Sequence, residues 1–370
     1  MNLSYWEYKT WLSNIDFTIV GSGIVGLNTA MSLSTRFPQA KVLILEKGTL
    51  PQGASTKNAG FACFGSISEV LSDLKTHSEK EVYELVQKRF DGIKLLRQNL
   101  GDSTIDFKQL GGHELFLEKQ VQLFEECDEK TASINKLLQP IFNAEAFRRT
   151  PNTFCFNGVN EHYITNTFEA QIDTGKMMAS LLKNVRQRGV RILNAVAVES
   201  FADNGASVKI KTNQFEFTSK KLLLATNGFA KELVGEDVHP ARAQVLITKP
   251  IENLRIKGTF HFDEGYYYFR NIDDRILFGG GRNLDFETEE TAEFGQTVVV
   301  QNNLKSLLHQ TVLPNTPFKL DSNWSGIMGI GSKKRPIVKQ LSSNVFCGIR
   351  LGGMGIAIGS SVGNELAELV

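Results

Sequence analysis

The stretch that decides the fold is the run DFTIV at residues 16–20, followed at once by GSGIVG at residues 21–26. The first run is short, apolar and rich in β-branched residues, which is typical of a buried strand. A helical pattern begins after the glycines, and a second apolar strand follows at residues 41–46 (KVLILE). The glycines therefore lie between a strand and a helix inside a βαβ unit of about 30 residues, which is the context that a dinucleotide-binding turn requires.

Each glycine of this turn has a physical role. Gly21 allows the tight turn, Gly23 lets the backbone approach a pyrophosphate, and Gly26 lets the helix pack closely on the strand. The free N–H groups at the start of the helix then face the phosphates. Glu46, 20 residues after Gly26, can bind both hydroxyls of an adenosine ribose and would repel the 2′-phosphate of NADP. We therefore predict cofactor contacts along this unit at Gly21, Gly23, Ile24, Val25, Gly26, Glu46 and Lys47.

A second glycine-rich segment, GASTKNAG at residues 53–60, comes just after the second strand. Small and polar residues there can lay backbone against a large planar ligand, although an ordinary loop has the same composition. The βαβ unit itself recognises only the ADP half of a dinucleotide, so it does not separate FAD from NAD.

These two segments and several later ones resemble the D-amino-acid oxidase superfamily of FAD-dependent oxidoreductases, which includes glycine oxidase, sarcosine oxidase and γ-glutamylputrescine oxidase. The later segments are LLLATNG (222–228), RAQV (242–245), YYYFR (266–270), ILFGGG (276–281) and the final stretch 350–370 with GGMG at 352–355. The resemblance implies an α/β fold in which a Rossmann-like FAD-binding domain (1–78, 164–238 and 326–370) is interleaved with a substrate-binding domain built on a mostly antiparallel sheet (79–163 and 239–325). It also implies further FAD contacts at Gly53, Ala54, Ser55, Lys57, Asn58, Ala59, Gly60, Val196, Ala225, Thr226, Asn227, Gly228, Gly352, Gly353, Met354, Gly355 and Ile356. A helix predicted at 360–369 would then point its N-terminus at the flavin and stabilise negative charge there.

The segment YYYFR at 266–270 is the predicted catalytic strand. Alternate side chains of a strand share a face, so Tyr266, Tyr268 and Arg270 lie together, and the arginine fork matches a carboxylate. A well-packed aromatic strand with a surface arginine is the alternative. We assign the acidic run at 285–293 to the start of a solvated helix.

Four departures from the family pattern limit what the resemblance implies. Met328 occupies the position where glycine oxidase-like members place a carboxylate-binding arginine, so Arg270 or Arg242 would have to take that role. Leu277 replaces the lysine that helps sarcosine oxidase react with oxygen, and Met354 replaces a common histidine. The stretch from Trp324 to Val338 lacks the cysteine that attaches FAD in sarcosine oxidase-like members, so we expect non-covalent FAD.

Composition narrows the function further. The chain has 370 residues, and its 41 basic and 40 acidic residues give a net charge of +1, which does not indicate a nucleic-acid partner. It shows no apolar run long enough to span a membrane and no secretory signal, so we expect a cytoplasmic protein. Residues 1–14 are expected to form a short helix on the outside. The four cysteines lack metal-type spacing, so no metal site is expected.

The expected reaction is oxidation of the C–N bond of a small amine or amino acid by hydride transfer to the flavin, with oxygen or another acceptor taking the electrons. Of the six histidines, His261 and His113 are the candidates for a test. Two alternatives stay open: an FAD dehydrogenase of a hydroxy acid, and a flavin-binding partner protein without turnover.

Overall fold

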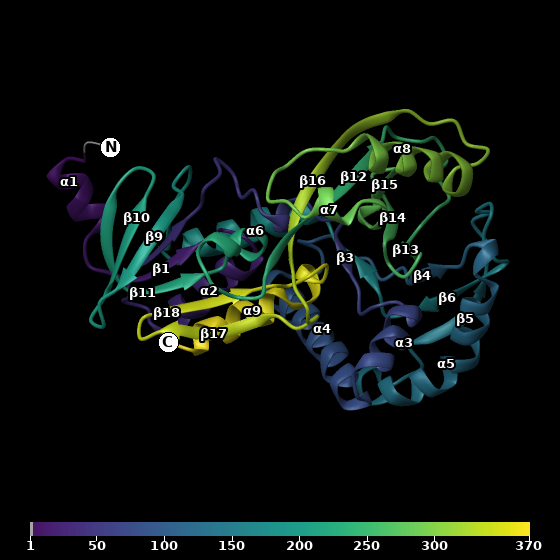
Figure 1. Cartoon of the computed structure of the whole chain (residues 1–370), viewed down its shortest axis with the longest axis horizontal. Helices are drawn as coiled ribbons and strands as arrows, with labels where there is room; N and C mark the ends of the chain where they lie inside the picture. The colour runs from purple at the N-terminus through teal and green to yellow at the C-terminus, as the bar shows by residue number, and fades with distance from the viewer. Residues whose placement is uncertain (1–2) are drawn as a thin grey trace.

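The computed structural model describes residues 3–370 and has an elongated shape with one large β-sheet at each end (Figure 1). The sheet at the N-terminal end has the central order β17-β18-β11-β1-β2-β8, with β10 and β9 continuing from the first half of β11. Strands β18, β11, β1, β2 and β8 run parallel to one another, and β17 is antiparallel to β18. The strands of this sheet are β1 (Ile15–Val20), β2 (Val42–Leu45), β8 (Arg191–Leu193), β9 (Val198–Asp203), β10 (Val208–Thr212), β11 (Glu216–Leu224), β17 (Ile337–Ser342) and β18 (Val345–Ile349).

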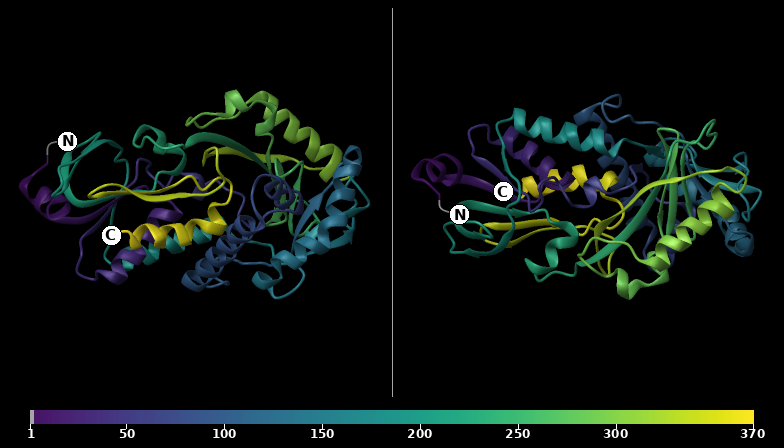
Figure 2. Two further views of the ribbon diagram at one scale, coloured as in Figure 1. Left: turned by 60° about the horizontal axis from the view of Figure 1, so that its bottom comes forward. Right: turned by 90° about the horizontal axis from the view of Figure 1, so that it is seen from above.

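Helices α2, α6 and α9 cover one face of this parallel sheet (Figure 2). The opposite face packs against the β9–β10 hairpin through a second apolar cluster that includes Val20, Leu45 and Ile210. Because both faces are covered, β2 and β18 are buried along their whole length, as parallel strands usually are. This end of the molecule therefore has the predicted Rossmann-like architecture.

The second sheet has the order β16-β12-β15-β14-β13-β4-β6-β5, and every neighbouring pair is antiparallel except β13 with β4. Its outer face carries an aromatic core in which the rings of Phe260 and Phe269 stack 4.6 Å apart. Helix α8 covers this face through Val300 and Leu304. The strands are β4 (Gly112–Leu115), β5 (Phe147–Pro151), β6 (His162–Asn166), β12 (His239–Thr248), β13 (Thr259–Phe262), β14 (Tyr267–Ile272), β15 (Arg275–Gly280) and β16 (Leu320–Ile330).

A two-stranded sheet, β3 (Phe61–Ala62) with β7 (Ala170–Gln171), lies between the two large sheets. Capping boxes begin α3 at Ser66 and α4 at Ser78, where each serine hydroxyl accepts from the amide of a glutamate three residues on. The main helices are α2 (Ile24–Arg36), α3 (Ile67–Thr76), α4 (Glu79–Leu100), α5 (Val121–Phe142), α6 (Thr174–Gln187), α7 (Phe286–Glu289), α8 (Val298–Leu307) and α9 (Gly355–Glu368).

The structure contains both of the helices predicted near the two ends of the chain. Helix α9 begins at Gly355, five residues before the expected start, so it follows the last glycine turn directly. Near the other end, α1 (Tyr5–Glu7) and a π-helical turn (Tyr8–Leu12) form the expected outer helix, with Tyr5 and Trp6 exposed; Met1 and Asn2 lie outside the described residues. Within residues 3–370, no helix is both long and apolar enough to cross a membrane.

Candidate functional site

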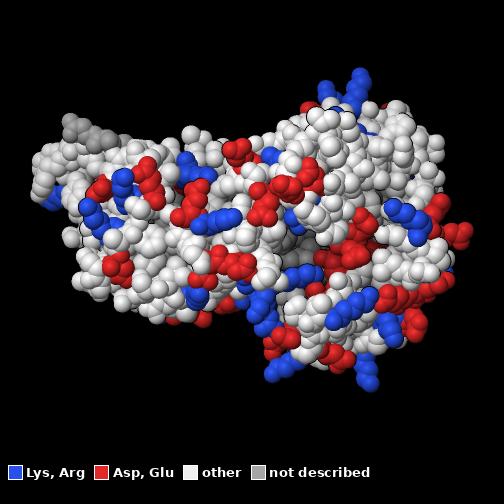
Figure 3. Space-filling model, in the orientation of Figure 1, with Lys and Arg blue, Asp and Glu red and all other residues white. Residues whose placement is uncertain are grey.

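A cavity of about 690 Å³ lies between the carboxyl ends of β1, β2 and β11 and the near face of the second sheet. This edge is where open α/β sheets bind their ligands. The surface is hollowed between the two ends of the molecule, with acidic side chains along one side of the hollow (Figure 3). Of the residues predicted to contact the cofactor, only Gly26 does not line the cavity; those that do are Gly21, Gly23, Ile24, Val25, Glu46, Lys47, Gly53, Ala54, Ser55, Lys57, Asn58, Ala59, Gly60, Val196, Ala225, Thr226, Asn227, Gly228, Gly352, Gly353, Met354, Gly355 and Ile356.

The first glycine turn has no room for side chains. Gly21 has φ +102°, which L side chains rarely adopt. A Cβ on Gly26 would lie 2.0 Å from the carbonyl oxygen of Gly21, so this glycine sets how closely α2 packs on the turn. Gly23 precedes the first turn of α2 and lines the cavity. The cavity wall here is therefore backbone with free amide groups at a helix start, which suits phosphate.

Glu46 is held in place by the same turn. Its carboxylate is buried and accepts hydrogen bonds from the amide of Ser22 (3.0 Å), the hydroxyl of Ser22 (2.7 Å) and the amide of Gly48 (3.0 Å). A carboxylate oxygen can accept more than one hydrogen bond, so acceptor capacity remains for hydroxyl groups. A fixed carboxylate in the cavity wall, next to a glycine turn, matches the ribose-binding position of a dinucleotide site.

The loop 53–60 is fixed against the start of α2 and against the second sheet. The Ser55 hydroxyl accepts from the Ile24 amide at 2.9 Å, and the Trp324 indole donates to the Lys57 carbonyl at 2.9 Å. Arg270 is almost completely buried and donates from one guanidinium nitrogen to the carbonyls of Gly60 (3.0 Å) and Ile172 (2.7 Å). Burial lowers the pKa of Arg270 to about 10, so it is still protonated at neutral pH.

The far end of the cavity is closed by the turn that begins α9. The amide of Leu351 donates to the Asn227 side chain at 3.0 Å, which joins this turn to the segment after β11. Met354 lies at the N-cap of α9, and its sulfur is 3.8 Å from the Cys63 sulfur. The helix N-terminus therefore faces the cavity through Gly355 and Ile356.

The strand predicted to be catalytic places two of its three residues in the cavity wall. Tyr267 and Phe269 point into the aromatic core, whereas Tyr266 and Tyr268 line the cavity. Burial raises the pKa of the Tyr268 hydroxyl to about 12. Arg270 shares their face but does not line the cavity, since its guanidinium group reaches under the loop instead. We therefore interpret Arg270 as a support of the loop 53–60 and not as a carboxylate ligand.

Comparison with known proteins agrees with this geometry. The family model described as FAD dependent oxidoreductase (DAO) matches residues 16–369. The chain belongs to this family. Its cofactor is accordingly FAD, which the glycine turn, Glu46 and the size of the cavity fit.

Individual relatives are distant. A probable oxidoreductase OrdL of Haemophilus influenzae is 20% identical over 98% of this chain and 84% of its own length. An L-2-hydroxyglutarate dehydrogenase of Escherichia coli is 24% identical over 79% of this chain and 72% of its own length. Among solved structures, glycine oxidase from Geobacillus kaustophilus is similar with a TM-score of 0.76 and 18% identity, covering 96% of this chain and 94% of that one. The chain is therefore an oxidoreductase with the fold of the FAD-dependent oxidoreductase family.

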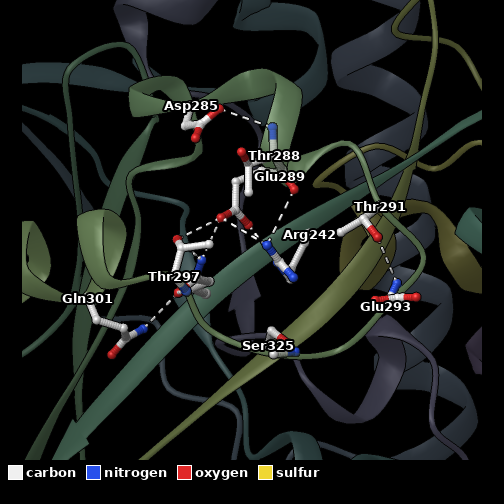
Figure 4. A network of polar contacts seen from close by, with 11 residues as sticks. Arg242, Asp285, Thr288, Glu289, Thr291, Glu293, Thr297, Gln301 and Ser325 are labelled. Carbon is white, nitrogen blue, oxygen red and sulfur yellow. Dashed lines mark hydrogen bonds and ion pairs between the residues drawn. The ribbon is translucent and has the colours of Figure 1, made fainter.

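Arg242, the other arginine considered as a carboxylate ligand, is already paired in this oxidoreductase. It binds Glu289 through two nitrogens, at 2.7 and 3.2 Å, and Gln244 and Thr297 donate to the same carboxylate (Figure 4). Glu289 is completely buried. The prediction that the acidic run at 285–293 is solvated was therefore wrong at this position, although the run does begin a helix, α7, capped by Asp285. The reason is the long-range pairing with Arg242, which compensates the buried charge.

Arg282 is a cavity-lining cation that the sequence analysis missed. It follows β15 in a short turn, stacks 4.7 Å over the Phe286 ring, and lies beside Tyr266 in the cavity wall. Within the described chain, no ion pair or hydrogen bond of its guanidinium group is found. Its sequence context, GGRNL, gave no signal, because the cavity wall depends on how the turn folds back on β14.

The residues that depart from the family pattern also have defined places. Met328 lines the cavity. Leu277 is buried against Ala59 of the loop 53–60 and against Val245. The side chains of His261 and Glu69 complete the wall on the side of the second sheet.

Proposed function

We propose that this flavoenzyme oxidises the C–N bond of a small amine or amino acid that carries a carboxylate. The observation that carries the proposal is the unpaired Arg282 beside Tyr266, in the same cavity as the FAD-binding residues. Burial lowers the pKa of Arg282 from its ordinary value, which is far above neutrality, so the group remains a cation. A guanidinium fork on an aromatic ring is a preorganised carboxylate ligand.

Different residues of this chain would bind the cofactor and orient the substrate. The turn 21–26, Glu46, loop 53–60 and the turn before α9 would hold FAD, whose isoalloxazine ring accepts a hydride. Arg282 would orient the substrate carboxylate, and Tyr266 and Tyr268 would form a flat wall that excludes water. We expect FAD to be non-covalent, since burial raises the pKa of the cavity-lining Cys63 thiol well above its usual range and keeps it protonated.

A hydroxy acid is the second candidate substrate. One relative is an L-2-hydroxyglutarate dehydrogenase, and a carboxylate ligand suits a hydroxy acid as well as an amino acid. The electron acceptor is likewise open between oxygen and another acceptor, because an apolar Leu277 lies where a lysine assists oxygen in sarcosine oxidase-like members.

Anaerobic reduction of the FAD-loaded protein tests these proposals. The panel contains glycine, sarcosine, D- and L-proline, γ-glutamyl amines and L-2-hydroxyglutarate, and the oxidised-flavin band near roughly 450 nm is followed. We expect an amine of this panel to bleach the band and the hydroxy acid not to. Reduction by the hydroxy acid alone would refute C–N oxidation, and full FAD retention without any reduction would favour a protein without turnover.

The role of Arg282 is tested with the amine that reduces the flavin. Arg282→Gln should raise its Kd about 10- to 100-fold, because one charge-assisted contact to a carboxylate is lost. Arg275→Gln is the matched control, since Arg275 lies on the same hairpin but pairs with Asp321 outside the cavity. Equal Kd values for both variants would contradict the assignment.

A further inference from the structure

We propose that His261, held by Glu169, accepts the proton that the amino group of the substrate must lose before its C–H bond is oxidised. The inference rests on the proposed C–N oxidation and adds a proton acceptor to it. An amine with a pKa near that of lysine, about 10.4, is neutral in on the order of one molecule in a thousand at pH 7, so a base in the cavity would be needed for fast turnover.

The position of His261 follows from the sheet. His261 on β13 is directly opposite Tyr268 on β14 and Glu114 on β4, so the three side chains form a row on the face toward the FAD-binding end. The His261 ring lines the cavity and meets the Phe61 ring edge-on, with centroids 5.1 Å apart. The same Phe61 ring lies against Tyr268. His261 therefore belongs to the wall that the substrate would touch.

Glu169 comes from a distant part of the sequence and is built into its position. Its side chain is 1% exposed, and one carboxylate oxygen accepts from the Phe64 amide at 2.9 Å. The other oxygen is 3.5 Å from Nε2 of His261. A Cβ on Gly112 would lie 1.8 Å from that oxygen, so the glycine makes room for the carboxylate. A fixed carboxylate beside an imidazole orients the ring and stabilises the imidazolium that protonation forms.

The surroundings of His261 favour the protonated ring. Besides Glu169, the carboxylates of Glu69 and Glu114 act on His261, and Tyr268 and the Cys63 thiol face it from neighbouring elements. His113 acts on it only through its charge, from the other face of the sheet. Burial alone lowers the pKa of His261, but the negative charge of Glu169, 3.5 Å from Nε2 and helped by the other carboxylates, raises it above its ordinary value.

His113, one strand away, shows the opposite behaviour and provides an internal contrast. It points into the aromatic core, stacks on Phe260 and binds the Thr165 hydroxyl at 2.8 Å. Burial lowers its pKa to about 4. Of these two histidines, His261 on the cavity side is the one whose surroundings favour a proton.

The proposed step transfers one proton from the substrate to His261. A substrate ammonium N–H bond breaks, its electron pair stays on the nitrogen, and the proton forms a bond to a neutral imidazole nitrogen of His261. No electron is exchanged in this step, and the resulting neutral amine is the form whose α-hydrogen can leave as hydride. Release of the proton to solvent returns His261 to its neutral form.

The experiment measures the rate of anaerobic flavin reduction between pH 5.5 and 10 with the reducing amine of the panel, for wild type, His261→Gln, Glu169→Gln and His113→Gln. In wild type the rate should fall as the pH drops through the raised pKa of His261. In His261→Gln the rate at pH 7 should fall about 100-fold, and the defect should shrink towards pH 10, where solvent has already deprotonated the amine. His113→Gln should keep the wild-type profile.

Glu169→Gln provides the second measurement, because it leaves the imidazole in place. Removing the carboxylate lowers the pKa of His261, so the acid limb of the profile should move to lower pH; the same shift should appear in the His261 ring resonances by NMR. An unchanged acid limb in both His261→Gln and Glu169→Gln would overturn the inference while leaving C–N oxidation intact. If no amine reduces the wild type, it is the proposed function that fails.

Discussion

The two ends of the molecule build their share of the cavity in different ways. At the FAD-binding end the wall is mostly backbone: the glycine turns at 21–26 and 352–355 and a helix start. At the other end the wall is made of side chains, among them Tyr268, His261 and Arg282, which project from an antiparallel sheet. Backbone cradles recognise a constant cofactor through amide groups, whereas a wall of side chains can change with the substrate on the same scaffold.

The largest effect should come from adding one methyl group at the backbone-built end. Gly26→Ala places a Cβ 2.0 Å from the Gly21 carbonyl, so α2 cannot approach β1 without moving the turn. We expect FAD binding to be lost and the free energy of unfolding to fall by about 4 kcal/mol or more. Isothermal titration with FAD measures the first and urea denaturation the second. Gly235→Ala, where a Cβ meets nothing within 4 Å, should behave as wild type; equal losses in both variants would refute the packing argument.

At the end whose cavity wall is made of side chains, we expect the loss of stability to come from an unpaired buried charge and not from a change in side-chain volume. Arg242→Met leaves Glu289 buried without its partner, and we expect a loss of about 3 kcal/mol in urea denaturation. Replacing both residues, in Arg242→Met with Glu289→Met, should recover most of the loss, because no uncompensated charge remains. A double variant as unstable as the single one would show that packing and not the ion pair is responsible.

A smaller effect should depend on pH. Burial raises the pKa of Glu114 to about 7, although hydrogen bonds from Ser68 lower it. Because this folded-state pKa lies above the unfolded value of 4.5, the contribution of the group is complete below about pH 4.5 and is lost as the pH rises through 7. Glu114→Gln should therefore be more stable than wild type at pH 8, on the order of 2 kcal/mol, and nearly equal to it at pH 4.5.

Urea denaturation at the two pH values checks this expectation. Glu125→Gln, which changes an exposed glutamate on α5, is the control and should show no such difference. A Glu114→Gln variant without a pH-dependent gain would indicate that Glu114 is already compensated in its charged form.

The same contrast explains what the sequence could predict. The glycine turns and Glu46 are local patterns, since the residues that form each cradle are close in sequence, and they led directly to the Rossmann-like fold and to a dinucleotide. FAD itself was implied only by the resemblance of the later segments to a known family. The alternation of Tyr266, Tyr268 and Arg270 was also predictable from strand geometry, and the structure places them on one face. The hydrogen-bond partners of Arg270 were not predictable, because the Gly60 and Ile172 carbonyls reach it from other elements.

Long-range partners account for the remaining differences. Glu289 is buried because Arg242 meets it across 47 residues of sequence, and Glu169 reaches His261 from a segment far upstream. Arg282 became a cavity residue only through the turn that follows β15. Pairings of this kind leave no periodic or compositional trace in a single sequence, so they could not be found without the structure.

The strand order of the first sheet also has a consequence for biosynthesis. β1 is formed near the N-terminus, but its neighbour β11 pairs with β18, and the turn at 351–356 that closes the cavity lies near the other end of the chain. Ribosomes synthesise residues in order, at about 5–20 per second. The apolar faces of α2 and β1 therefore remain uncovered until α9 has been synthesised. The FAD-binding sheet and its cavity are therefore expected to be completed only after α9 has been synthesised, and cofactor loading is expected to follow that step.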